Sequence, residues 1–120
     1  MGQFQKFRVL HYFFSINDRN KTIAHCLDFD LVTSGDSIEE AERRLDILVK
    51  FQIETFLKSN GVSGLGGQAP KRFWAAYIDC LRHGGALPSS TLRIDVPSPV
   101  PMEKPYGELQ VVSANLALAA

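Results

Sequence analysis

The sequence predicts an α+β fold in which a small antiparallel sheet of three consecutive strands is followed by one or two helices and a further strand. Three observations support this prediction. Residues 4–16 are rich in aromatic and β-branched side chains, residues 36–60 carry apolar residues at helical spacing, and residues 92–96 alternate between apolar and charged. A chain of 120 residues accommodates one core, so we expect a single domain over residues 1–120.

The first three strands are predicted within residues 1–35. The strand at 4–16 is apolar on both faces in its second half, which is typical of a central strand. Turn-forming residues at 17–20 separate it from a second strand at 21–29, and Leu31–Thr33 forms a short third strand ended by Ser34 and Gly35. If the first turn is centred between Asp18 and Arg19, His11 lies opposite Cys26 in the resulting hairpin.

The clearest local signal is a helix start at Asp36. We expect Asp36 to be the N-cap, with Glu39 reaching back to the cap N–H as in a capping box. The strand-strand-strand-helix core then covers residues 1–60 and ends near Gly61. A glycine-rich loop follows at 61–68, and a second, one-sided helix is predicted at 69–84.

The last part, residues 90–120, is predicted as a proline-rich extended tail. Residues 92–96 and 109–112 have strand patterns, but Pro97, Pro99, Pro101 and Pro105 between them cannot donate to a sheet ladder. We expect these prolines to form a stiff arm that reaches a neighbouring subunit.

Charge argues against a nucleic-acid-binding surface. Thirteen basic residues balance thirteen acidic ones, and neither half of the chain concentrates positive charge. The N-terminus has no pattern of a signal peptide and no apolar segment suggests a membrane span, so a reduced, cytoplasmic protein is expected.

The histidines, cysteines and acids are the candidates for chemistry in this chain. His11, His25 and Cys26 could meet on the first hairpin, with Cys80 or His83 as a further zinc ligand, but the usual zinc spacings are missing and packing roles are favoured. Packing is also favoured over a Cys26 nucleophile with His11 as its base. Asp28 and Asp30 could hold magnesium in a nuclease, yet two acids make a poor ligand set. We therefore predict no catalytic residue, no metal site and no cofactor.

Apolar side chains exceed what one small sheet face can cover. Phe51 widens the stripe of the first helix, and Phe73, Trp74 and Tyr77 line the second. We predict that these four residues belong to a partner interface, and that the protein is a homo-oligomer, most simply a symmetric dimer.

Residues 21–57 resemble the HicB family of antitoxins. The specific part of the resemblance is the motif Gly35-Asp36-Ser37 followed by Glu39-Glu40-Ala41, which joins the short third strand to the helix. The resemblance implies a strand-strand-strand-helix-strand fold similar to a double-stranded-RNA-binding domain, with the helix packed on one face of the sheet.

The resemblance also implies a function. HicB-like antitoxins bind and mask a small RNA-cleaving toxin, and many carry a separate DNA-binding tail, for which residues 61–120 show no pattern. We therefore expect a noncatalytic protein that neutralises such a toxin or binds another protein partner. A small RNA-binding module, or a solitary HicB-like protein, is the alternative.

Overall fold

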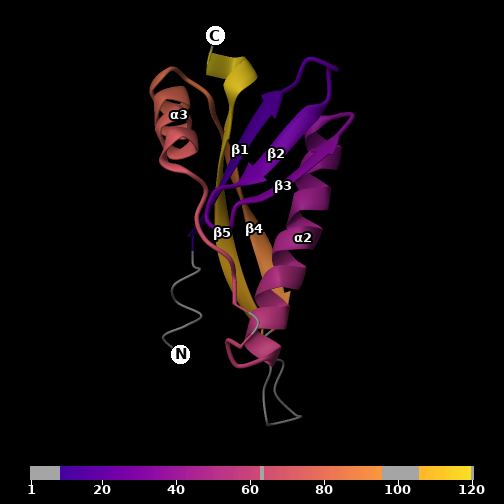
Figure 1. Cartoon of the computed structure of the whole chain (residues 1–120). Helices are drawn as coiled ribbons and strands as arrows, with labels where there is room; N and C mark the ends of the chain where they lie inside the picture. The colour runs from indigo at the N-terminus through magenta and orange to yellow at the C-terminus, as the bar shows by residue number, and fades with distance from the viewer. Residues whose placement is uncertain (1–8, 63, 96–105, 120) are drawn as a thin grey trace.

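The computed structural model of the chain describes residues 9–62, 64–95 and 106–119. It is an α+β fold, as the sequence predicts (Figure 1). The described residues form two helices and one five-stranded sheet, with two strands after the helices where the sequence predicts one. Strands β1 (Val9–Ile16), β2 (Thr22–Cys26) and β3 (Leu31–Gly35) come first. Helices α2 (Ile38–Lys58) and α3 (Lys71–Arg82) follow. Strands β4 (Ala86–Asp95) and β5 (Tyr106–Asn115) and the short 3₁₀ helix η1 (Leu116–Ala119) complete the chain.

The sheet is mixed rather than purely antiparallel. Its strand order is β3-β2-β1-β5-β4, with β1 at the centre as its two-sided apolar pattern predicts. Neighbouring strands run antiparallel except β1 and β5, which are parallel. A parallel neighbour requires a crossover connection, and the two helices together with β4 provide the chain length for it.

The final part of the chain completes the sheet, which corrects the prediction of a tail with apolar strands left for a partner to cover. β5 lies between β1 and β4, and four apolar residues of the predicted tail are buried within this chain: Leu92, Ile94, Leu109 and Val111. The prolines of the predicted arm at 97–105 lie outside the described residues, as does the predicted strand start at 4–8.

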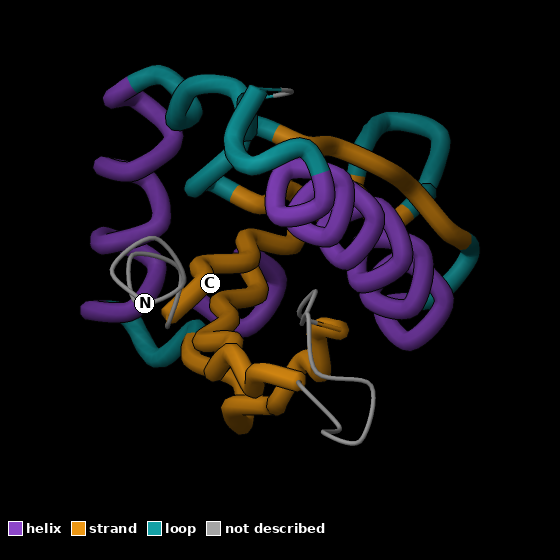
Figure 2. Tube along the Cα trace, turned by 90° about the horizontal axis from the view of Figure 1, so that it is seen from below, coloured by secondary structure: helices purple, strands orange, loops and turns teal. Residues whose placement is uncertain are grey.

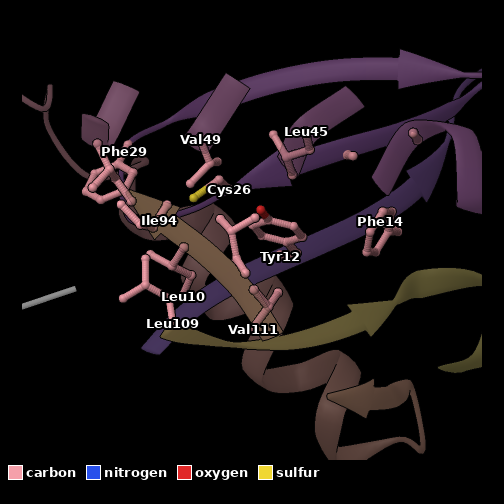
Figure 3. Close-up of a cluster of buried hydrophobic side chains, with 14 residues drawn as sticks. Leu10, Tyr12, Phe14, Cys26, Phe29, Leu45, Val49, Ile94, Leu109 and Val111 are labelled. Carbon is pink, nitrogen blue, oxygen red and sulfur yellow. The ribbon is translucent and has the colours of Figure 1, made fainter. Parts of the chain in front are cut away.

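The two helices cover opposite faces of the sheet (Figure 2). Successive residues of a strand point to opposite faces, so β1 contributes to both layers. Tyr12 and Phe14 pack with Leu45 and Val49 of α2 in the larger core (Figure 3). Phe13 packs with Tyr77 of α3 in the smaller core on the other face.

The first hairpin is shifted by one residue from the predicted register. Cys26 lies opposite Tyr12, not opposite His11, and Phe14 lies opposite Ala24 rather than Ile23. The cause is a five-residue turn centred on Arg19, in which the side-chain oxygen of Asn17 accepts from the N–H groups of Arg19 and Lys21. Because side chains alternate between faces, the shift puts Cys26 on the α2 side and leaves His11 on the α3 side.

Helix α2 begins one residue later than predicted. Ser37, not Asp36, is the N-cap, and its hydroxyl accepts from the N–H of Glu40 at 3.1 Å. The Glu40 carboxylate, rather than that of Glu39, accepts from the N–H of Asp36 at 2.7 Å. The capping interactions are therefore displaced by one position, because the strand continues to Gly35, and the Glu40 carboxylate bonds the N–H that precedes the N-cap residue rather than that of Ser37 itself.

Gly35 is needed for close packing at this junction. A Cβ at position 35 would lie 2.7 Å from the backbone N of Ala41, inside the first turn of α2. The absence of a side chain lets β3 pass directly beneath the helix start.

Helix α3 is shorter than predicted, with Pro70 as its N-cap residue and His83 as its C-cap. No helix in the described parts of the chain is long and apolar enough to cross a membrane.

Candidate functional site: an acidic cleft between α2 and β4

The hairpin register puts the predicted zinc and nucleophile candidates His11 and Cys26 on opposite faces of the sheet, although both side chains reach the carboxylate of Asp28, Cys26 Sγ at 3.9 Å. The His11 ring lies under α3, its Nδ1 3.1 Å from a carboxylate oxygen of Asp28 and its centroid 5.1 Å from that of Trp74. Within the described residues, no three histidine, cysteine or acidic side chains form a group that could hold a metal ion.

Asp28 and Asp30 are separated by their partners. Asp28 accepts from the backbone N–H of His11 at 2.7 Å, whereas Asp30 lies 2.7 Å from Nε2 of His25. The two acids thus tie the turn after β2 to different histidines and do not form a paired metal site.

The two thiols are poor nucleophiles. Burial, with the nearby carboxylate of Asp28, raises the pKa of Cys26 to about 12. The pKa of Cys80 is also raised by burial. Both thiols are therefore protonated at neutral pH, and a thiolate mechanism finds no support.

The predicted interface residues divide between two surfaces. Tyr77 is buried in the smaller core, and Phe73 and Trp74 are half-buried against it, so α3 uses much of its apolar stripe to cover its own sheet. This corrects the prediction that Tyr77 contacts a partner. Phe51 alone of the four is largely exposed, at 68% of its surface, on the outer side of α2.

Most of the HicB-like motif is structural. Gly35 and Ala41 are buried, Ser37 and Glu40 cap α2, and the exposed Asp36 pairs with Lys21. Glu39 is the exception because its side chain lines a cleft.

The cleft has a volume of about 320 Å³ and opens between the first turns of α2 and the start of β4. A β-bulge helps to shape it: Leu87 pairs with Ser113 and Ser90 pairs with Val111, so two residues of β4 oppose one of β5. The lining consists of two carboxylates, three hydroxyls and an apolar remainder, namely Phe14, Ile38, Glu39, Glu42, Leu87, Pro88, Ser89, Ser90 and Ser113.

Acidic side chains dominate the helix side of the cleft. Glu39, Glu42 and Asp46 follow one flank of α2 at intervals of three and four residues, and none of them forms an ion pair with a described lysine, arginine or histidine. Burial, Asp46 and Glu39 raise the pKa of Glu42. Burial also raises the pKa of Asp46, although its carboxylate accepts a 2.8 Å hydrogen bond from the Tyr12 hydroxyl. This flank is therefore a region of uncompensated negative charge.

The floor of the cleft holds a buried hydroxyl without a partner. Ser113 is only 4% exposed, and its Oγ makes no hydrogen bond to any described residue. A buried polar atom left unsatisfied costs about 1–3 kcal/mol. The cleft thus offers an unused hydrogen-bonding site at its base and carboxylates at its rim, a combination that suits an ammonium or guanidinium group.

Comparison with protein-family models, curated proteins and solved structures finds no match to this chain. The resemblance to HicB antitoxins therefore rests on the motif residues themselves.

The cleft could not be recognised from the sequence. The spacing of Glu39, Glu42 and Asp46 was visible as one flank of a helix, but such charges usually face solvent. Their significance depends on β4, which comes more than forty residues later and forms the opposite wall.

Proposed function

We propose that the chain is a noncatalytic, HicB-like cytoplasmic protein that binds a basic protein partner through the cleft between α2 and β4. The partner class that the resemblance implies is a small RNA-cleaving toxin, which the bound chain would keep inactive. The observation that carries the proposal is the cleft itself, in which Glu39 and Glu42 lack basic partners among the described residues and Ser113 lacks a hydrogen bond.

Charge supports a protein partner over RNA. Phosphates that enter the cleft would meet the carboxylates of Glu39 and Glu42 and be repelled, whereas lysine and arginine side chains would be attracted. An RNase that binds RNA through basic residues is masked most directly by an acidic surface that competes for those residues. The acidic cleft has the charge and the size to accept one or two such side chains.

The chemistry of the remaining candidates supports a noncatalytic role. The thiol closest to a histidine–aspartate pair is that of Cys26, 3.9 Å from Asp28, and its raised pKa keeps it protonated. The histidines hold the turn after β2 and pack against aromatic rings of α3.

The proposal is tested by photo-crosslinking the partner to a residue in the cleft. A photo-crosslinking side chain at Ser89 should link the chain to one small basic protein in lysate of the cells that produce it. The double variant Glu39→Gln, Glu42→Gln should reduce this capture by about tenfold, which is the effect of roughly 1.4 kcal/mol of lost charge attraction.

Two controls make the result decisive. The variant Asp18→Asn, Asp79→Asn removes the same charge from exposed positions away from the cleft and should capture the partner normally. The captured protein should cleave RNA alone and stop cleaving when the chain is added. Capture that is unchanged by the Glu39 and Glu42 substitutions contradicts the proposal. Capture of RNA without protein also contradicts it and favours the RNA-binding alternative.

A further inference from the structure

The outer side of α2 carries large apolar side chains that nothing in the described chain covers. Ile47, Leu48 and Phe51 are 63%, 40% and 68% exposed. The inner side of the same helix is already saturated, with Ala41, Leu45, Val49 and Ile53 fully buried. The outer residues are therefore surplus to the core, and water exposure of a phenylalanine and an isoleucine side by side is unfavourable.

Ile47 and Phe51 belong to a regular stripe along the helix. The stripe consists of Glu40, Arg44, Ile47, Phe51, Glu54 and Lys58, at alternating intervals of four and three residues. This is the heptad spacing with which one helix contacts another along its length. We call these six residues the outer stripe.

The outer stripe is complementary to itself in one orientation. When two copies of α2 lie antiparallel about an axis between Ile47 and Phe51, Ile47 of each copy meets Phe51 of the other. The same register places Arg44 opposite Glu54, and Glu40 opposite Lys58. All four ionic contacts of the pair then join opposite charges around an apolar centre. In a parallel pair, by contrast, every charged residue would meet its own copy, which is unfavourable.

Three charged side chains of the outer stripe also have partners within the chain. Arg44 donates to the backbone oxygen of Ser34 at 2.8 Å and lies 3.6 Å from Glu40, which also accepts from the N–H of Asp36. Glu54 lies 3.9 Å from Lys50 and accepts from the N–H of Asp95, and the side chains of Glu40 and Glu54 are 28% and 19% exposed. Side chains that are ordered beforehand lose less entropy when a partner docks. The zero net charge of the chain adds no overall repulsion between two copies.

We infer that the protein forms a symmetric dimer in which the outer stripes of two α2 helices pack antiparallel, with Ile47 against Phe51 at the centre. A second copy of this chain is the occupant that fits, because each charged residue of the stripe meets a residue of opposite charge when the second stripe runs in the reverse direction. The outer stripe is separate from the acidic cleft, which lies on the flank of α2 that bears Glu39 and Glu42. The dimer would therefore leave both clefts open.

Light scattering tests the dimer. The wild-type chain at about 100 µM should have twice the monomer mass, and Phe51→Asp should be monomeric because a carboxylate replaces the central apolar contact. Phe51 is exposed, so the variant should keep its fold, which a thermal melt verifies. Ile78→Asp is the matched control, since Ile78 is an exposed apolar residue on α3 at the other face of the sheet, and it should remain dimeric.

Disulfide cross-linking tests the orientation. In the antiparallel register, Ile47→Cys mixed with Phe51→Cys should form a covalent dimer at least about tenfold faster than either variant alone. The native thiols of Cys26 and Cys80 are buried and should not compete. A monomeric wild type, a dimeric Phe51→Asp variant, or faster self-linking of Ile47→Cys would each overturn the inference. The Phe51→Asp variant should still capture the basic protein, because its cleft is unchanged. A failure of the dimer inference can therefore be distinguished from a failure of the proposed function.

Discussion

At the scale of single residues, the environment of Glu42 differs from that of an ordinary glutamate on the surface of a helix. It is half-buried beside Glu39 and Asp46, and both burial and these like charges raise its pKa. A carboxyl group with a raised pKa in the folded state stabilises the protein when protonated. That stabilisation is present below the unfolded pKa and is lost as pH rises through the folded pKa. At neutral pH Glu42 is therefore retained at a cost in stability, as expected of a residue that serves binding.

The substitution Glu42→Gln should make the fold more stable at pH 7, by roughly 0.5 kcal/mol, because it removes one of three adjacent negative charges. The gain should shrink as pH falls and disappear near pH 4, where the wild-type carboxyl is itself about half or more protonated. Urea unfolding at both pH values measures the difference. Asp18→Asn, a matched charge change in the first turn, should show no such gain, and a Glu42→Gln variant that is less stable at pH 7 would contradict the argument.

At the scale of elements, the start of α2 shows how a correct local signal can be assigned one residue off. The sequence around Asp36 offers two capping arrangements, Asp36 with Glu39 and Ser37 with Glu40, and both have the spacing of a capping box. The choice is made by β3, which stays paired with β2 through Gly35. Asp36 is then too far from the helix to cap it and pairs with Lys21 instead.

Replacement of the observed N-cap residue, Ser37, should therefore lower the free energy of unfolding more than replacement of the predicted one, Asp36. Ser37→Ala should lower the free energy of unfolding by about 1 kcal/mol, since it removes the acceptor for the Glu40 N–H. Asp36→Ala should have a smaller effect, because it removes only an exposed ion pair. Denaturant unfolding of the two variants provides the comparison, and the reverse order of effects would show that the helix begins at Asp36.

At the scale of the whole molecule, β5 determines whether the chain can fold in pieces. It lies between β1 and β4, pairs with both, and contributes Leu109 and Val111 to the larger core. The strand-strand-strand-helix part of the HicB-like pattern would leave β1 as an unpaired edge without it. The last strand is thus an interior strand of the sheet, as the first is.

A chain ended after Pro97 should fail to fold cooperatively, because it lacks the interior strand and exposes the core that β5 covers. We expect a thermal melt without a sharp transition and an NMR spectrum with poorly dispersed amide signals, beside a cooperative full-length control. If residues 96–120 were only an arm, the shortened chain would instead give a well-dispersed spectrum and a normal melt.

The sequence by itself determined the elements whose signals are local. The alternation and composition of β1 predicted a central strand, the residues after Gly35 predicted a helix start within one position, and the apolar spacing of α2 and α3 predicted two amphipathic helices. Each of these depends on interactions between residues close in sequence, which propensity and periodicity record directly.

Tertiary structure alone decided the hairpin register, the place of β5 and the existence of the cleft. One extra turn residue moved Cys26 to the opposite face from His11, so that Cys26 packs in the core under α2 while the His11 ring packs against α3. The tail became part of the sheet because Leu109 and Val111 bury more apolar surface beside β1 than in a separate arm. Glu39, Glu42 and Ser113 come together only when β4 and β5 close over the side of α2, and such contacts between distant segments leave no periodic trace in the sequence.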